Sequence, residues 1–192
     1  VVIPVYFITL GIVEGCFFIN PLFGMIISVF LASLTLATKS LYDESKVVLN
    51  ALNRGDMEEA RKRLSMIVGR DTKDLNKEEI LRAVIETVSE NLSDGILAPM
   101  FYLTLGGVPL AMAYKAINTL DSMVGYKNAG YRDIGCFSAK MDDMANLIPA
   151  RLTGFIIIFS AFILRLNWRD SWRIMRRDGR NHSSPNSGIS EA

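Results

Sequence analysis

Acidic side chains recur at helical spacing near the middle of this chain, beside its most apolar stretches. Glu86, Glu90 and Asp94 are four residues apart, so on a helix they lie along one face. Like charges at this spacing repel each other, and something must offset that repulsion. A bound cation would do so, which makes the face a candidate site. The structural alternative is a solvated face, with Asn91 acting as a capping or turn residue.

Two further groups of oxygen-bearing side chains follow along the sequence. Asn118 and Asp121 are three residues apart and come directly after an apolar segment. Asp142, Asp143 and Asn146 form an Asp-Asp-x-x-Asn pattern, whose members share a face on a helix. Hard oxygen ligands of this kind suit Mg²⁺, which usually keeps several waters and bridges to a phosphate. An acidic first turn of a helix would explain the two aspartates equally well.

Basic residues are interleaved with these acids. Positive groups beside magnesium ligands are typical of sites that handle phosphoryl groups. Ion pairing at a membrane surface is the simpler alternative. The interleaved residues are Lys115, Lys127, Arg132, Lys140 and Arg151.

The elements around these side chains are apolar enough for a membrane. Half of the residues are hydrophobic, and the stretches 15–38 and 95–114 contain no charged residue. A helix needs roughly 20 apolar residues to cross a bilayer core. We therefore predict an all-α, polytopic membrane helical bundle, with two transmembrane helices in residues 1–38. The first ends near Val13, with a turn between Glu14 and Pro21, and the second runs from about Pro21 to Leu41.

The other two apolar segments are defective as membrane spans. Residues 95–114 carry Pro99, Gly106, Gly107 and Pro109, which indicates either a re-entrant hairpin or a kinked span. Residues 152–164 would make only about 20 Å of helix. We expect that neither segment crosses fully. Residues 95–192 then form broken membrane helices and polar site loops.

Residues 39–94 have a different character, with ten Lys/Arg and twelve Asp/Glu. We predict extramembrane helices here, arranged as a helical hairpin, one capped by Asp56 and running on to Gly69, the other capped by Asn76 with Glu79. The basic residues of this region, and the arginines with two tryptophans after residue 165, place both on the cytoplasmic side. We therefore expect an inner-membrane protein whose site faces the cytoplasm.

Composition excludes several classes of function. The net charge of +1 indicates no nucleic-acid partner. One histidine cannot build a multi-imidazole metal site, and the two cysteines have no metal or redox spacing. There is no Gly-x-x-x-x-Gly-Lys-Ser/Thr loop, so any use of ATP would need another kind of site. The chain opens inside an apolar run without Met, and we expect it to be part of a longer chain.

Several longer motifs resemble one known family, the adenosylcobinamide-phosphate synthases (cobinamide synthases), which are membrane proteins of cobalamin biosynthesis. The motifs that carry the resemblance are Leu64-Ser-Met-Ile-Val-Gly-Arg-Asp-Thr72, Glu86-x-x-x-Glu-Asn-x-x-Asp-Gly95, Ala98-Pro-x-Phe-Tyr102, Asn118-Thr-Leu-Asp-Ser-Met-Val-Gly-Tyr126, Asp142-Asp-x-Ala-Asn-x-x-Pro-Ala-Arg151 and His182-x-Ser-Pro-Asn-x-Gly188. They occur in the family's order and extend over nearly the whole chain. The resemblance also draws the tail from His182 into the site.

The resemblance implies a reaction. Family members join adenosylcobyric acid to (R)-1-amino-2-propanol or its O-phosphate through an amide bond. Making an amide requires an activated carboxylate, and ATP with Mg²⁺ is the expected source, through an acyl phosphate that the amine attacks. The implied partners are the corrinoid, the aminopropanol and the lipid bilayer, and a homo-oligomer is left open.

On the hypothesis of a synthase, we expect the following roles for individual residues. For Mg²⁺ they are Glu90, Asp94, Asp121, Asp142 and Asp143. For substrate binding they are Arg70, Asn91, Asn118, Lys127, Arg132, Asn146, Arg151 and Asn186. Glu86 or His182 would accept the amine proton. The alternatives are a non-catalytic corrinoid carrier of the same pathway and, less favoured, a membrane phosphotransferase.

Overall fold

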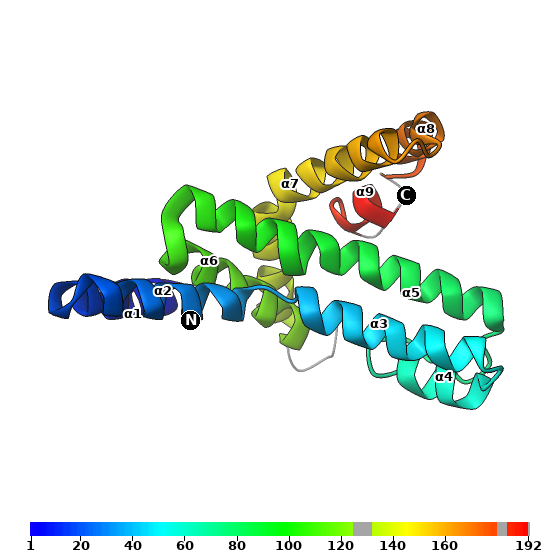
Figure 1. Ribbon diagram of the computed structural model, residues 1–192, viewed down its shortest axis with the longest axis horizontal. Coiled ribbons are helices and arrows are strands. Elements are labelled where there is room, and N and C mark those ends of the chain that lie inside the picture. The colour runs from blue at the N-terminus through cyan, green and yellow to red at the C-terminus, as the bar shows by residue number, and fades with distance from the viewer. Residues whose placement is uncertain (125–131, 180–183, 192) are drawn as a thin grey trace.

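A computed structural model describes residues 1–124, 132–179 and 184–191, and all the regular elements in these ranges are helices. The predicted all-α class is therefore confirmed. In chain order the elements are α1 (Val2–Ile19), α2 (Pro21–Thr35), α3 (Thr38–Asn53), α4 (Met57–Leu64), α5 (Lys77–Leu92), the π-helix η1 (Ser93–Leu97), α6 (Ala98–Val124), α7 (Arg132–Ile163), α8 (Trp168–Asp178) and α9 (Ser187–Glu191). Figure 1 shows them as an elongated bundle.

The two N-terminal helices form an apolar hairpin. The side-chain Oδ1 of Asn20 accepts hydrogen bonds from the backbone N–H groups of Leu22 and Phe23, at 2.9 and 3.2 Å. Pro21 occupies the first turn, where its missing N–H costs nothing. We predicted that the turn begins at Glu14, which is wrong, because Glu14 lies inside α1 and the turn begins at Asn20. Large side chains face outward here, and Phe18 is 93% exposed, as expected of a lipid-facing hairpin.

The second helix is shorter than predicted. We expected it to reach Leu41, but α2 ends at Thr35 and Leu36 is extended. The backbone N–H of Ala37 instead donates to the carbonyl of Gly95, at 2.9 Å. That bond replaces a helical one, so the end of α2 depends on a residue far along the chain.

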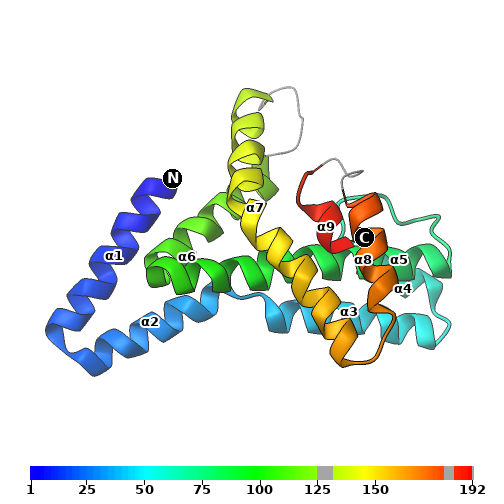
Figure 2. The same cartoon turned by 90° about the horizontal axis from the view of Figure 1, so that it is seen from above.

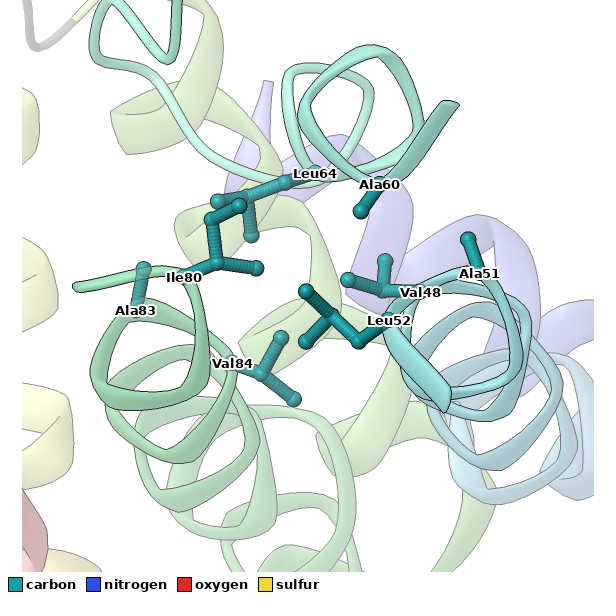
Figure 3. Close-up of a cluster of buried hydrophobic side chains, with 8 residues drawn as sticks. All are labelled: Val48, Ala51, Leu52, Ala60, Leu64, Ile80, Ala83 and Val84. Carbon is teal, nitrogen blue, oxygen red and sulfur yellow. The ribbon is translucent and has the colours of Figure 1, made fainter. Parts of the chain in front are cut away.

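Helices α3, α4 and α5 enclose a compact apolar cluster, drawn in Figure 3. The charged residues that made this region look extramembrane lie outside the cluster, whose arrangement is that of a soluble helical bundle. Its buried members are Val48, Ala51, Leu52, Ala60, Leu64, Ile80, Ala83 and Val84.

Both predicted helix caps in this bundle are confirmed. The side chain of Asp56 accepts from the N–H of Glu59 at 3.0 Å. Asn76 and Glu79 form a reciprocal capping box at the start of α5. The predicted end of α4 is wrong, since the helix stops at Leu64 and not near Gly69.

The chain reverses direction inside α6. Gly106 and Gly107 leave the helical conformation, and Gly107 has φ of +66°, a value that glycine adopts without strain. The rings of Tyr102 and Tyr114 stack with centroids 4.9 Å apart. Twelve residues of straight helix would separate them by about 18 Å, so the break folds α6 into a helical hairpin. The predicted broken helix is confirmed.

The later apolar segment belongs to a long helix. Residues 152–164 were predicted to be too short for a span, but they continue a helix that begins at Arg132. By length and composition, four segments of the described residues are long and apolar enough to cross a membrane: Val2–Ile19, Pro21–Asn53, Lys77–Met123 and Gly135–Ile163. The second includes the end of α2 at Thr35, and the third includes the break at Gly106–Gly107. The number of true crossings stays a prediction. After α7 the chain turns back through α8 to α9, which packs beside α5 and α7 (Figure 2).

Candidate functional site

A polar cleft of about 630 Å³ lies where α5 and η1, the returning half of α6, α7 and the segment leading into α9 meet. Its wall is rich in carboxylates, carboxamides and hydroxyls, although the outer faces of the neighbouring helices are apolar. The lining residues are Ile67, Gly69, Glu90, Asn91, Asp94, Asn118, Asp121, Ser122, Ala139, Asp142, Asp143, Asn146, Ser184, Asn186 and Ser187.

The π-helix η1 sets the position of Asp94. One wide turn at Ser93–Leu97 changes the phase of the helix between α5 and α6. Single π-turns of this kind are frequent at functional sites. The close approach of Gly95 to the α2–α3 junction holds the turn, since a Cβ on Gly95 would lie only 3.1 Å from that of Ala37. The junction between two N-terminal helices therefore supports one wall of the cleft.

A chain of hydrogen bonds orients Asp142 from behind. The Tyr114 hydroxyl, on a residue only 1% exposed, donates to Asn146 Oδ1 at 2.8 Å and also lies 3.1 Å from the Asp94 carbonyl oxygen. Asn146 Nδ2 then donates to Asp142 Oδ2 at 2.9 Å. Asn118 Nδ2 makes a long contact of 3.5 Å with the other oxygen of Asp142. These amides leave Asp142 little freedom to rotate.

The C-terminal segment closes the cleft on its other side. The Ser184 hydroxyl donates to Asp143 Oδ1 at 2.9 Å, and Asn186 Nδ2 donates to the Asp143 backbone carbonyl at 2.8 Å. Asn186 Oδ1 is buried and has no hydrogen-bond partner among the described residues. This segment can approach because α7 has Gly154 here, where a Cβ would come within 2.8 Å of Ile189.

The described part of the cleft concentrates negative charge. Among the side chains that the structure describes, no Lys or Arg forms an ion pair with Asp94, Asp121, Asp142 or Asp143. Within the same residues, no three His, Cys, Asp or Glu side chains are close enough to form a complete protein-only metal site. The negative charge of these four aspartates is therefore not offset by a described basic side chain.

Comparison with known proteins shows the family to which this chain belongs. A model described as "CobD/Cbib protein" matches residues 1–192. The chain belongs to the CobD/Cbib family. The resemblance found in the sequence motifs is thereby confirmed. No solved structure was found to match.

Curated relatives agree with the family model. The chain is 57% identical over 182 residues to a "Cobalamin biosynthesis protein CobD" of Geobacter metallireducens, covering 95% of this chain and 57% of the relative. It is 54% identical over 185 residues to the protein of that name in Clostridium perfringens, covering 96% and 59%. The Streptococcus sanguinis protein of that name is 55% identical over 173 residues, covering 90% and 55%. The chain thus spans less than two thirds of each relative's length.

Most residues that the motifs singled out in this CobD/Cbib chain lie in the cleft. The tail and the central stretch, far apart in sequence, meet as predicted through Asp143. Those that line it are Glu90, Asp94, Asp121, Asp142 and Asp143 among the predicted magnesium ligands, with Asn91, Asn118, Asn146 and Asn186.

The remaining predicted residues have other positions. Arg70 and Glu86 form an ion pair of 2.6 Å and line a neighbouring groove of about 260 Å³, which shares Glu90 and Asn91 with the cleft. Arg151 does not line the cleft, because its exposed guanidinium donates to the Leu147 carbonyl in its own helix. Three predicted side chains lie outside the described residues: those of Lys127, Arg132 and His182.

Sequence reasoning missed Tyr114 and gave Ser184 no role. Tyr114 read only as the end of an apolar segment, and its contact with Asn146 exists because α6 folds back at Gly106–Gly107. The break itself was visible in the sequence, but not the register in which the two halves pair. For Ser184 the signal was its place in the tail motif.

Proposed function

We propose that this chain carries the site of an adenosylcobinamide-phosphate synthase, which forms an amide between adenosylcobyric acid and (R)-1-amino-2-propanol or its O-phosphate. One observation carries the proposal: in a CobD/Cbib family chain, nine motif residues from four segments converge on one polar cleft. The names of the relatives, which refer to cobalamin biosynthesis, support the same pathway. ATP and Mg²⁺ are the expected co-reactants.

The donor set of the cleft fits Mg²⁺. Its carboxylate oxygens are hard ligands, and Asn186 Oδ1 is a buried acceptor without a described partner. Mg²⁺ is commonly held by one or two carboxylates together with waters and substrate phosphates, so a complete protein cage is not required. We assign Asp142 and Asp143 the central role, with Glu90, Asp94 and Asp121 around them. Bound there, the ion would offset phosphate charge.

The neighbouring groove suits an anionic part of the substrates. Arg70 stands there beside the shared wall residues Glu90 and Asn91. Its guanidinium already pairs with Glu86, so a phosphate would compete for it, and release of Glu86 would free a carboxylate to accept a proton. His182 remains the other proposed base, and Lys127 and Arg132 remain proposed phosphate contacts.

We also propose how the site lies relative to the membrane. The groove is lined by residues 67–70, between α4 and α5, and by α5 itself, so it adjoins the charged α3–α5 bundle; this supports a cleft that opens to the cytoplasm. The hairpin of α6 would then enter the inner membrane and return, with its break at Gly106–Gly107 inside.

The test is turnover by the purified full-length protein in lipid nanodiscs. With adenosylcobyric acid, the aminopropanol or its phosphate, ATP and Mg²⁺, we expect one amide bond for each ATP consumed. Asp143→Asn should abolish most of this activity, whereas Asp74→Asn, an exposed change of the same chemistry in the loop before α5, should leave it unchanged.

Two results would count against the proposal. Equal activity of Asp143→Asn and the parent would remove the magnesium assignment. Corrinoid binding without ATP consumption would instead identify the chain as a carrier of the pathway.

A further inference from the structure

Helix α8 folds back along the C-terminal part of α7 (Figure 2). The rings of Phe162 and Trp168 have centroids 5.8 Å apart, and those of Phe155 and Trp172 are 5.9 Å apart. The earlier residue of α7 pairs with the later residue of α8, so the two helices run antiparallel. Met175 adds a third contact, with its sulfur against Gly154.

The arginines of α8 all lie on one side of the helix. Taking roughly 100° per residue, the four fall within an arc of about 100°, next to the two tryptophans. They are Arg169, Arg173, Arg176 and Arg177, and all are exposed. The described ion pairs of α8 are internal, to Asp170 and Asp178, so no other described element neutralises this face.

The part of α7 that packs beside α8 is apolar, and much of its side-chain surface remains exposed. Phe155, Phe159 and Phe162 are 53%, 62% and 57% exposed, and Ile163 and Leu164 continue the same surface. Aromatic and aliphatic side chains of this size are costly to leave in water. The hairpin therefore has an uncovered apolar side on α7 and a cationic side on α8.

These two sides constrain how the hairpin meets a bilayer. If α7 stood upright through the membrane, Trp172 and its neighbours Arg173 and Arg176 would lie at the depth of Phe155. Exposed arginines are rare in the hydrocarbon core, because each one carries a desolvation cost there. An orientation in the plane of the interface avoids this cost and gives tryptophan its preferred location.

We propose that residues 152–178 form an interfacial hairpin that binds the surface of an anionic phospholipid bilayer. The exposed phenylalanines of α7 enter the acyl boundary, and the α8 arginines contact headgroup phosphates. The C-terminal half of α7 then does not cross the membrane. Since α9 packs on the same helices at Gly154 and Gly179, the bound hairpin also fixes the segment that holds Asn186 in the cleft.

The first test measures depth in the full-length protein. In a background with Cys16→Ser and Cys136→Ser, nitroxide labels are placed at Phe159→Cys, at Arg173→Cys and at Phe7→Cys in the apolar helix α1. Collisions with oxygen and with a water-soluble nickel chelate give the depth of each label. We expect position 159 at about 5–10 Å below the headgroups and position 173 at the headgroups.

Two outcomes of this measurement would overturn the proposal. A label at position 159 near the bilayer centre, about 15 Å deep, would show that α7 crosses. Protection of position 159 from both collision agents would show that protein covers it, either a second copy or a segment outside these residues.

The second test concerns lipid charge. In vesicles of phosphatidylcholine with phosphatidylglycerol, nickel collisions at position 159 should fall relative to phosphatidylcholine alone. Changing the four α8 arginines to glutamine should abolish that dependence. A matched variant with Arg54, Lys62, Lys73 and Lys77 changed to glutamine, all exposed in the α3–α5 bundle, should keep it. Equal behaviour of the two variants would reject specific headgroup contacts by α8.

Discussion

The α3–α5 bundle and the cleft bury opposite kinds of side chain. In the bundle the interior is aliphatic, and Leu64 and Ile80 are fully buried in it (Figure 3). The cluster includes no charged side chain. Around the cleft the interior is polar, with Tyr114, Asn146 and Asp142 joined by hydrogen bonds. The apolar side chains of the surrounding helices are instead exposed.

This contrast shows how the solvent around each part decides where its charges lie. Charged side chains cover the outside of the bundle, as water favours, and its apolar residues collect inside. Lipid cannot solvate carboxylates, so among helices apolar enough for a membrane these are expected to gather in a cleft shared by several helices. Changing equivalent residues in the two regions should therefore have different consequences, one mainly for stability and the other mainly for function.

The largest expected effect is on the bundle. Leu64→Ala removes a fully buried side chain and should destabilise α3–α5 by about 2–5 kcal/mol. Hydrogen exchange of α5 amides in the full-length protein measures this loss. Met66→Ala, at an exposed position two residues on, should change the free energy of opening measured by exchange by less than about 0.5 kcal/mol. Similar losses in both variants would mean that the cluster is not a packed core.

In the cleft Asp142 is a proposed Mg²⁺ ligand of the proposed synthase. On that proposal we expect Asp142→Asn to lower kcat/KM of amide formation by at least about 100-fold, because even partners of a metal ligand typically contribute 10–100-fold. The change preserves the shape of the side chain but replaces one acceptor oxygen by a donor. If the new amide keeps its oxygen toward Asn146, only the long contact with Asn118 is lost, so the thermal midpoint should move little. If stability fell strongly while activity was retained, Asp142 would support the fold and not the reaction.

A smaller effect should follow from Tyr114→Phe. The change removes the hydroxyl that holds Asn146 and leaves a buried amide oxygen without its donor. We expect the Mg²⁺ concentration for half-maximal activity to rise about 10-fold, as for loss of a residue that orients a ligand.

The control for this variant is Tyr102→Phe. It loses a hydrogen bond of similar length, 2.8 Å to the Ala145 carbonyl, from the ring stacked on Tyr114. Because this bond does not lead to Asp142, the Mg²⁺ requirement should stay within about threefold of the parent. If both variants needed the same higher Mg²⁺ concentration, the packing of Tyr102 on Tyr114 would be responsible and not the hydrogen bond to Asn146.

The smallest effect is expected at the cap of α5. Asn76→Ala removes the side chain that accepts from the Glu79 N–H and should reduce stability by about 1 kcal/mol. Asn76→Asp should restore it. Thermal unfolding reports both values, and amide synthesis at low temperature should be the same in all three proteins.

Much of this architecture could be predicted from local pattern. The caps at Asp56 and Asn76, the Asn20–Pro21 turn and the break at Gly106–Gly107 depend on interactions within a few residues. The end of α2 could not be predicted, because it depends on a bond between Ala37 and Gly95. The length of α7 was misjudged because an uncharged run was taken as the limit of a helix.

The sequence by itself determined the residue types of the site, the helical periodicity that gathers Glu90 with Asp94, and the membership of the CobD/Cbib family. Only the tertiary structure decided which of these side chains meet. It brought Asn186 to Asp143 across 43 positions, placed Tyr114 behind Asn146, and left Arg151 outside the cleft. The physical reason is range: caps and turns are local, whereas a hairpin register or a contact permitted by Gly154 depends on packing between distant helices.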